Sequence, residues 1–282
     1  MFVTYTIKSG GWCAEVAPNL GANVTSLTLD GREVFVPLKS RDQLEENPYI
    51  QGAPLLLPAN RTAEGRFTFE GREYTLPITE PKTGANLHGL LHRQPFTLVS
   101  CNEKCIVLEY KNQGEIYPFP FTITVVYGFE SDSFMQRYII KNTGDTNMPL
   151  TFALHTSFVE PESFTVPIDA CQRKDEKHIP IGGYHPLDEQ EQRYITGSPS
   201  KGISASGYYR ACGRTATIGN LNYTASEGFD HWILFNGAGK CGLLCVEPQC
   251  GAVNGLNTPD GCKILAPGEE LELYTRLSRR KQ

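Results

Sequence analysis

The sequence predicts an all-β protein, built as one large antiparallel β-sandwich with very little helix. Twenty-seven glycines and nineteen prolines interrupt the 282 residues at short intervals. The runs between them are short, rich in β-branched and aromatic residues and often alternate between apolar and polar positions, which is typical of strands bounded by turns. Helical periodicity is almost absent. Strands do not alternate regularly with helices, so a parallel sheet is not expected.

Individual strands can be located from these runs. Residues 67–76 form two alternating runs around Glu70-Gly71, and residues 96–99 and 105–110 flank a turn, so both regions are expected to be β-hairpins. Only residues 41–46 and 187–192 can form a helical turn or two before a Gly or Pro intervenes. Further strands are expected at 122–129, 134–141, 150–158, 232–236, 242–246 and 271–278.

The whole chain, residues 1–282, is expected to fold as a single domain. All-β sandwiches and barrels often reach about 200–250 residues without division. No low-complexity linker separates one part of the chain from another. Hydrophobic and charged residues make up 40% and 20% of the chain, which is ordinary globular usage and predicts a sizeable buried core.

Charge and hydropathy narrow the class of partner. The 26 basic and 31 acidic residues give a net charge of −5, which supplies no basic field to attract nucleic acid. No stretch approaches about 18 consecutive apolar residues, and the first residues form neither a basic nor a continuous apolar signal region. We therefore expect a small-molecule ligand, no nucleic-acid or membrane partner, and a cytoplasmic location.

The cysteines indicate free thiols rather than a disulfide framework. They number nine, an odd count, and they are scattered along the chain. Cys101 and Cys105, and likewise Cys241 and Cys245, are four residues apart, but paired Cys-x-x-Cys units with matching partners are absent. We therefore expect reduced cytosolic thiols, no metal and no cofactor.

Polar residues embedded among apolar strand residues are the candidates for chemistry, because a polar group in a sheet core needs a partner or a purpose. Five short segments have this character. They are Pro-Ala-Asn-Arg at 58–61, Asn-Leu-His-Gly at 86–89, Phe-Ala-Leu-His-Thr-Ser-Phe at 152–158, Gly-Phe-Asp-His-Trp at 228–232 and Cys-Val-Glu-Pro-Gln at 245–249.

His155 and Glu247 are the sharpest candidates. His155 interrupts an apolar run, so a strand would carry it into largely buried surroundings, where an imidazole needs partners. Glu247 follows an apolar run and precedes a proline, at the end of an expected buried strand, and carboxylates are rarely buried unpaired. The ordinary alternatives are a structural core histidine and a strand-end carboxylate turned to solvent.

Arg61 and His88 are weaker on their own. Arg61 follows a loop and is equally well explained as a surface arginine. His88 is four residues before His92, the spacing of a helical metal pair, but the neighbouring glycines and proline argue against a helix, and a hydrogen-bonded loop histidine is the ordinary alternative. Together, these histidines, carboxylates and the arginine suggest acid/base chemistry on a neutral polar substrate. A serine-hydrolase elbow, Gly-x-Ser-x-Gly, is absent.

The five segments, in this order, resemble the aldose 1-epimerase (galactose mutarotase) family over nearly the whole chain. The resemblance includes the Asn-Arg loop at 60–61, Leu-His-Gly at 87–89, Tyr-Pro-Phe-Pro-Phe at 117–121 and Glu-Pro-Gln at 247–249. One such motif is weak evidence, whereas five in order are specific. The resemblance implies a galactose mutarotase-like β-supersandwich with an open cleft.

The resemblance also implies roles for individual residues. Glu247 would take the proton from the anomeric hydroxyl as general base, and His155 would protonate the ring oxygen as general acid. His88 would assist at the ring. Arg61, Asn60 and Asp230 would bind the sugar through its hydroxyls.

Three departures from the family pattern stand out. Asp230 and Glu247 are only 17 residues apart, which resembles the shorter members and leaves open how the wall of the cleft is built. Cys250 occupies a position where threonine is common, and His155 is followed by Thr-Ser-Phe rather than an aromatic pair. These changes affect expected substrate contacts and leave the acid/base pair intact.

The expected function is therefore the interconversion of the α and β anomers of a free aldose such as glucose or galactose. One alternative is a mutarotase of a hexose phosphate, which needs basic residues converging at the rim of the cleft. The other is a carbohydrate-binding protein without turnover, which would not require Glu247 and His155 together. The sequence identifies neither the sugar nor the oligomeric state.

Overall fold

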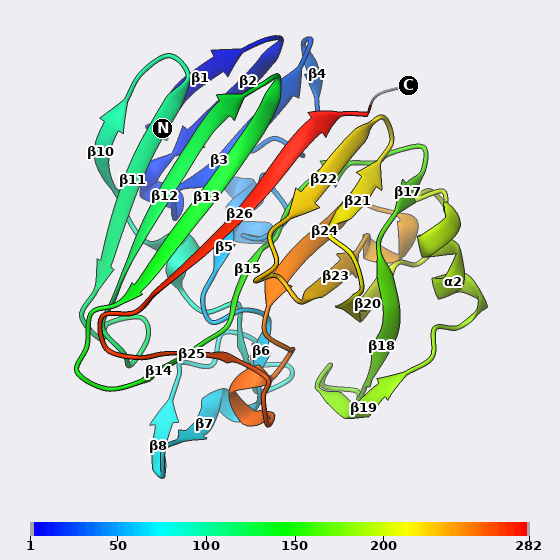
Figure 1. Cartoon of the computed structure of the whole chain (residues 1–282). Coiled ribbons are helices and arrows are strands. Elements are labelled where there is room, and N and C mark those ends of the chain that lie inside the picture. Colours follow the sequence, from blue (N-terminus) through cyan, green and yellow to red (C-terminus); the bar gives the residue numbers. More distant parts are fainter. Residues whose placement is uncertain (1–2, 281–282) are drawn as a thin grey trace.

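The computed structural model describes residues 3–280 and confirms the predicted antiparallel β-sandwich (Figure 1). Its first large sheet has eight strands, and it forms the front of the molecule in Figure 1, from the long strands on the left to short yellow and green strands on the right. In spatial order these strands are β10 (Thr97–Cys101), β11 (Cys105–Asn112), β12 (Phe121–Glu130), β13 (Ser133–Asn142), β26 (Glu270–Arg279), β22 (Leu221–Ala225), β21 (Thr215–Ile218) and β17 (Phe164–Thr165).

The second large sheet also has eight strands and carries the candidate site. Its neighbouring strands are antiparallel, and β24 lies near its middle. In order they are β19 (Pro180–His185), β18 (Ile168–Lys174), β20 (Ser206–Ala211), β23 (His231–Phe235), β24 (Leu243–Cys250), β15 (Phe152–Leu154) and β5 (Leu55–Leu56), with β16 (Ser157–Val159) also paired to β24.

Smaller sheets complete the fold. A four-stranded sheet, blue in Figure 1, lies beside the long strands of the first sheet and consists of β1 (Tyr5–Ser9), β2 (Trp12–Ala17), β3 (Asn23–Leu29) and β4 (Arg32–Glu33). The two-stranded sheets pair β14 (Met148–Leu150) with β25 (Lys263–Leu265), β6 (Arg61–Thr62) with β9 (Asn86–Leu87), and β7 (Arg66–Phe69) with β8 (Arg72–Thr75).

Helix is confined to short pieces, as the sequence predicts. The two α-helices are α1 (Asp42–Glu46) and α2 (Glu189–Thr196), and α2 begins with a capping box formed by Asp188 and Glu191. Among residues 3–280, no helix has the length and apolar character needed to cross a membrane. Single 3₁₀ turns lie at Pro18–Leu20, Ala63–Gly65, Leu91–Arg93, Gly237–Gly239 and Gly255–Asn257.

Both predicted hairpins are confirmed. In the β7–β8 hairpin, Phe69 pairs with Arg72 across Glu70 and Gly71, which have φ angles of 48° and 78°. Two successive positive φ values are the geometry of the tight turn that suits the twist of paired strands. The β10–β11 pair forms the second hairpin, with a register irregularity between Leu98 and Ser100.

The predicted strand boundaries around the candidate site need two corrections. The expected strand 150–158 is divided among β14, β15 and β16, and His155 lies in the interruption between β15 and β16, because its backbone N–H donates to Pro54 O rather than to a regular ladder. The expected strand 242–246 continues to Cys250, so Glu247 lies inside β24 and not at its end. Pro248, which has no N–H to donate, is accommodated where the β15–β16 interruption breaks the ladder on that side of β24.

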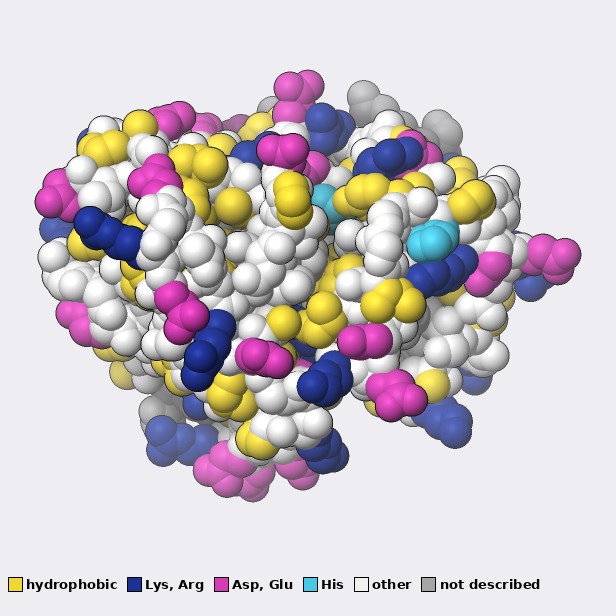
Figure 2. All heavy atoms as spheres, turned by 90° about the horizontal axis from the view of Figure 1, so that it is seen from below, with side chains coloured by type: hydrophobic (Ala, Val, Ile, Leu, Met, Phe, Trp, Pro, Cys, Tyr) yellow, Lys and Arg dark blue, Asp and Glu magenta, His cyan; other side chains and the backbone are white. Residues whose placement is uncertain are grey.

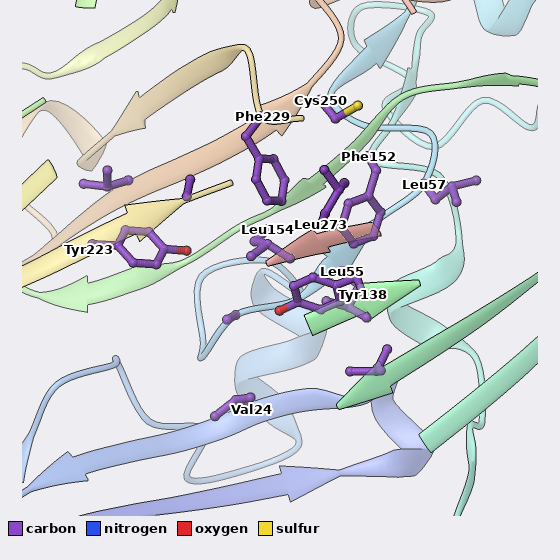
Figure 3. Close-up of a cluster of buried hydrophobic side chains, with 14 of the residues drawn as sticks. Val24, Leu55, Leu57, Tyr138, Phe152, Leu154, Tyr223, Phe229, Cys250 and Leu273 are labelled. Carbon is purple, nitrogen blue, oxygen red and sulfur yellow. The ribbon is translucent and has the colours of Figure 1, made fainter. Parts of the chain in front are cut away.

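The main core lies between the sheets. Figure 3 shows Phe152 and Leu154 of β15 pointing toward Tyr138 of β13, with Leu273 of β26 in the same cluster. The rings of Phe152 and Tyr138 are 5.3 Å apart, and these side chains are fully buried or nearly so. This packing supports the second sheet from behind, so that its other face is free to carry polar residues.

Candidate active site

Glu247 lies on a strand that is buried at every one of its eight positions. Because side chains alternate across a strand, Cys245, Glu247 and Gln249 share the face opposite the main core. Glu247 pairs in register with Ile233 of β23, and only 2% of its surface is exposed. The sequence thus places a carboxylate in the middle of a buried sheet.

His155 faces this carboxylate. The residues two before and two after His155 pair with those two after and two before Glu247, so the register sets the two residues opposite each other. His155 Nε2 is 3.4 Å from Glu247 Oε1, and both side chains are buried. Directly opposed residues in an antiparallel pair are the closest side-chain neighbours that a sheet offers. The structure therefore brings together the two residues that the sequence ranked highest.

Burial shifts both groups toward their neutral forms. It lowers the pKa of His155 to about 4, against a smaller opposing effect of a backbone hydrogen bond. It raises the pKa of Glu247 well above its ordinary value, and the positive charge of Arg61 offsets part of that rise. Burial therefore favours a protonated Glu247 beside a neutral His155, so that the pair holds one proton.

His88 stands at the other side of His155. Its φ angle is 62°, and its backbone N–H donates to Asn60 O at 2.7 Å, which fixes a sharp turn immediately after β9. The His88 and His155 rings meet edge to face with centroids 5.3 Å apart. Burial, then the neighbouring His155 and Arg61, hold the pKa of His88 well below its usual value. A neutral His88 can donate or accept one hydrogen bond to a ligand in the cleft.

Arg61 is held rigidly at the mouth of the site. Its Nε and Nη2 donate to the two carboxylate oxygens of Glu80, each at 2.7 Å, and its Nη1 donates to Tyr208 Oη at 3.1 Å. A bidentate arginine–carboxylate pair fixes orientation as well as charge. The surface interpretation of Arg61 is therefore wrong, since its side chain is largely buried in the wall of the cleft.

Asn60 also lines the cleft. It has a φ of 55°, which asparagine tolerates better than most residues, and it is 3% exposed. Its buried Oδ1 has no hydrogen-bond partner among residues 3–280. A buried amide oxygen without a partner is costly, so a ligand hydroxyl is the natural group to satisfy it.

Asp230 is not brought to the cleft with these residues. Its carboxylate accepts from His231 Nδ1 at 2.7 Å and from Gly251 N at 2.8 Å, and Lys263 Nζ lies 3.7 Å away. Burial is the largest single effect and raises the pKa of Asp230, but the hydrogen bonds from His231 and Gly251 and the charges of His231 and Lys263 together hold the net pKa below the usual value. Asp230 precedes β23, whereas the cleft is lined from Ile233 onward.

The cleft encloses about 270 Å³ beside His155 and Glu247. Figure 2, a view from below relative to Figure 1, shows histidine side chains at the surface of this face, with acidic and basic side chains around them. The walls of the cleft come from the second sheet and from the loops that precede and follow β6 and β9. The residues that line it and were expected from the sequence are Asn60, Arg61, His88, His155 and Glu247.

Several lining residues were missed. Tyr49 packs against three imidazoles, with ring centroids 4.6 Å from His88, 5.0 Å from His92 and 6.1 Å from His155. Tyr49 lies in a segment between α1 and β5 with no strand or helix pattern, so no local signal marks it. Tyr208, on β20, looks like an ordinary alternating strand aromatic until its contact with Arg61 is known.

One group of side chains could hold a metal ion. The ligand atoms of His155, Cys245 and Glu247 lie within 4.8 Å of one another, and it is the group with such spacing among the residues that the structure describes. Cys245 Sγ lies 3.2 Å from Ser157 Oγ. In the sequence, cysteine spacing pairs Cys245 only with Cys241 as a candidate metal ligand, and no local signal connects it with His155.

Comparison with known proteins identifies the family of the chain. The aldose 1-epimerase family model matches residues 3–208 of the chain. The chain belongs to the aldose 1-epimerase family. Curated relatives are the uncharacterized protein YihR of Escherichia coli, 26% identical over 200 residues, and the galactose mutarotase of Rattus norvegicus, 26% identical over 188 residues. These matches cover 68% and 60% of this chain and span 63% and 53% of the two relatives.

Solved structures of the same fold extend over nearly the whole chain. A galactose mutarotase-like protein from Clostridium acetobutylicum has a TM-score of 0.90 at 20% identity and covers 98% of this chain and 95% of its own. A galactose 1-epimerase from Lactobacillus acidophilus has a TM-score of 0.78 at 15% identity, covering 99% and 98%. The galactose mutarotase-like fold predicted from the sequence is confirmed.

Proposed function

We propose that this aldose 1-epimerase family member interconverts the α and β anomers of an aldose. The observation that supports this most directly is the buried pair of Glu247 and His155, with 3.4 Å between carboxylate oxygen and imidazole nitrogen, at the side of a sugar-sized cleft. Anomer exchange needs one group that accepts a proton and one that donates a proton at the anomeric centre. The pair supplies both.

In the proposed reaction Glu247 takes the proton of the anomeric hydroxyl. The electron pair left on that oxygen forms the carbonyl bond at C1, the bond from C1 to the ring oxygen breaks, and the ring oxygen receives a proton from His155. Rotation about the C1–C2 bond presents the other face of the carbonyl. Closure reverses both transfers, so that the pair returns to its starting protonation.

The reacting form of the pair requires an ionised Glu247 and a protonated His155. Burial disfavours both charges, so it favours the form in which Glu247 holds the proton and His155 is neutral. Moving that proton from Glu247 to His155 across 3.4 Å gives the reacting form without exchange with solvent. The fixed charge of Arg61 lowers the pKa of Glu247 and so favours this transfer.

The remaining residues of the cleft are proposed to hold the sugar. Asn60 Oδ1 would accept from a hydroxyl, and His88 would hydrogen-bond near the ring. Arg61 would orient a hydroxyl with an N–H that its hydrogen bonds to Glu80 and Tyr208 leave unused, since a guanidinium has five such donors. Asp230 is left out of this set, because its carboxylate is engaged elsewhere.

Polarimetry of freshly dissolved α-glucose and α-galactose tests the proposal. The protein should speed the approach to anomeric equilibrium above the spontaneous rate. Glu247→Gln keeps the shape and hydrogen bonding of the side chain but removes its proton affinity, so the rate should fall by on the order of 10²–10⁴, the usual contribution of a general base.

Circular dichroism and a thermal melt must show that Glu247→Gln is folded. A folded variant that retains mutarotation within about threefold of wild type would make Glu247 a structural carboxylate, because a general base contributes far more than that. Sugar binding without any rate enhancement by the wild-type protein would instead favour a carbohydrate-binding protein that lacks turnover.

A further inference from the structure

Cys245 lies beside the acid/base pair, and the proposed chemistry does not use it. Side chains two residues apart on a strand share a face, so Cys245 and Glu247 project from β24 on the same side. His155 faces Glu247 from the interruption between β15 and β16. One ligand atom from each of these three residues lies within 4.8 Å of the other two. A thiol, an imidazole and a carboxyl group therefore converge at one point of the buried sheet.

The spacing of these atoms is close to that of a tetrahedral zinc site. Bonds of about 2.0–2.2 Å to nitrogen and oxygen and about 2.3 Å to sulfur place the ligand atoms of such a site about 3.4–3.6 Å apart. His155 Nε2 and Glu247 Oε1 already have this separation, at 3.4 Å. The sulfur of Cys245 lies within 4.8 Å of a ligand atom of each, so small side-chain rotations complete the site.

The charges of the three groups match a divalent cation. On binding, the ion replaces the proton of the thiol and the proton of the carboxyl group, and both protons leave to solvent. A thiolate, a carboxylate and a neutral imidazole then surround the ion, and the complex has no net charge. Burial favours a neutral complex, because a net charge would be poorly solvated there. The positive charge of Arg61 is already paired with Glu80.

The cleft provides an entry path and a fourth ligand position. His155 and Glu247 line the cleft, whereas the side chain of Cys245 is fully buried. An ion that enters through the cleft therefore meets the imidazole and the carboxyl group first and the sulfur last. Three protein ligands leave the fourth tetrahedral position for a water molecule or a sugar hydroxyl.

The surroundings favour a reversibly bound ion over a permanently held one. A ligating histidine normally donates its other ring N–H to a carbonyl or carboxylate, which fixes its orientation. His155 Nδ1 is buried and has no hydrogen-bond partner on another residue in the described range 3–280. Cys245 does have support, since Ser157 Oγ lies 3.2 Å from its sulfur and can donate to a thiolate. The site is thus only partly pre-organised for metal.

We propose that His155, Cys245 and Glu247 form a binding site for a thiophilic divalent cation such as Zn²⁺, and that the bound ion blocks anomer exchange. The metal site follows from the geometry alone, whereas the block rests on the proposed roles of Glu247 and His155. The ion occupies the lone pairs that would otherwise exchange protons with the sugar. Mg²⁺ and Ca²⁺ should not bind, because they prefer oxygen ligands and Cys245 supplies sulfur.

Cobalt absorption spectroscopy tests the metal site without reference to activity. Co²⁺ added to the reduced protein should give a thiolate-to-metal charge-transfer band, and Zn²⁺, which has no geometric preference to lose in a tetrahedral site, should displace it. Cys245→Ala should lack this band. Cys250→Ala makes the same change at another buried cysteine of β24, one that faces the main core, and should keep the band. Equal bands in wild type and Cys245→Ala would assign the cobalt to other thiols and overturn the site.

Polarimetry during a Zn²⁺ titration tests the block. Zn²⁺ should bring the wild-type rate down to the spontaneous rate, EDTA should restore it, and Mg²⁺ should have no effect. Neither cysteine takes part in the proposed proton transfers, so both alanine variants should match wild type without metal. Cys245→Ala should need on the order of 10- to 100-fold more Zn²⁺ or beyond, since loss of a group that merely orients a ligand already weakens metal binding that much. Equal sensitivity of Cys245→Ala and Cys250→Ala to Zn²⁺ would contradict the proposal.

The two readouts separate failure of the metal site from failure of the proposed function. A cobalt band that depends on Cys245, together with unchanged anomer exchange at saturating Zn²⁺, would contradict the roles of Glu247 and His155 and leave the metal site standing. If the wild-type protein speeds the exchange of no sugar, the proposed function fails, and the cobalt band alone decides the metal site. Circular dichroism must show that Cys245→Ala is folded, and Cys245→Ser, which keeps a polar atom beside Ser157, replaces it if it is not.

Discussion

Two pairs of acidic and basic side chains on the strands of this molecule lie in contrasting environments. On the outer face of β13 and β26, Arg137 donates to Glu272 at 2.6 Å, and both side chains are about half exposed. On β24, Glu247 faces His155 at 3.4 Å with both side chains buried. The exposed pair remains fully charged in water, whereas burial drives the second pair toward its neutral form.

The difference between the exposed and the buried pair shows in which environment a pair of ionisable groups is suited to proton transfer. An exposed ion pair contributes about 0–1 kcal/mol, because water solvates both charges almost as well apart as together. A buried pair faces a desolvation cost that can exceed its mutual attraction. Such a pair is a poor means of stabilisation, but the one proton that it holds is available for transfer to and from a bound substrate.

The largest expected effect tests whether the buried pair acts as one unit. His155→Asn should reduce anomer exchange about as much as Glu247→Gln, on the order of 10²–10⁴. The double variant should lose much less than the product of the two single losses, since either change already removes proton transfer. Polarimetry of all three folded variants measures this. Independent, multiplicative losses would mean that the two residues do not share a proton.

The fold and the buried positions of His155 and Glu247 could be predicted because their signals are local. Alternation, turn residues and the apolar runs around His155 and Glu247 are visible in short windows of sequence. Only the predicted boundaries of the two strands around these residues were wrong. His155 falls in an interruption of the ladder, and Glu247 lies inside its strand rather than at the end. Pro248 misled the second prediction, because a proline normally ends a central strand.

The rest of the site depends on contacts between distant segments. Tyr49 reaches three histidines from a segment without pattern, and Lys174 reaches Tyr208 from a strand end. Asp230 belongs to a recognisable motif, yet the motif does not show that His231 and the backbone of Gly251 occupy its carboxylate. Sequence patterns identify residue types for chemistry, while tertiary packing decides which of them share a cleft.

A smaller effect is expected from Tyr49, which covers the histidine side of the buried pair. Tyr49→Ala should raise KM and lower kcat/KM on the order of tenfold, because the ring that packs on His88 and His155 excludes water from the site. Tyr49→Phe keeps the ring and should restore most of the activity. Tyr274→Ala, on β26 of the first sheet, is the control at an exposed tyrosine. A loss of stability in Tyr49→Ala without any change in KM would assign Tyr49 a structural role only.

The buried histidines should also make stability depend on pH. Burial, with Arg93 nearby, lowers the pKa of His92 to about 3, while the unfolded chain titrates near 6.5. Between these values the unfolded state binds the extra proton, so the free energy of unfolding falls as pH is lowered, by at most about 1.4 kcal/mol per unit.

Urea denaturation at pH 7 and pH 5 measures this slope. His92→Phe keeps a ring against Tyr49 but cannot titrate, so it should lose about 1–2 kcal/mol less than wild type over that interval. His155, with its pKa lowered to about 4, contributes in the same direction and remains in both proteins. Identical pH dependence in wild type and variant would mean that His92 is as free to protonate in the folded protein as in the unfolded chain.

The smallest effect is expected for the exposed pair of Arg137 and Glu272. Glu272→Gln removes the charge that faces Arg137 but leaves a side chain of the same shape in a position that is about half exposed. The free energy of unfolding should change by less than about 1 kcal/mol, and high salt should reduce even that difference, because mobile ions screen an exposed pair. Anomer exchange should equal that of wild type.

Both substitutions are Glu→Gln on a β-strand, so urea melts and polarimetry of Glu272→Gln beside Glu247→Gln compare one chemical change in two environments. A stability loss of several kcal/mol in Glu272→Gln would show that burial is not what separates the two pairs.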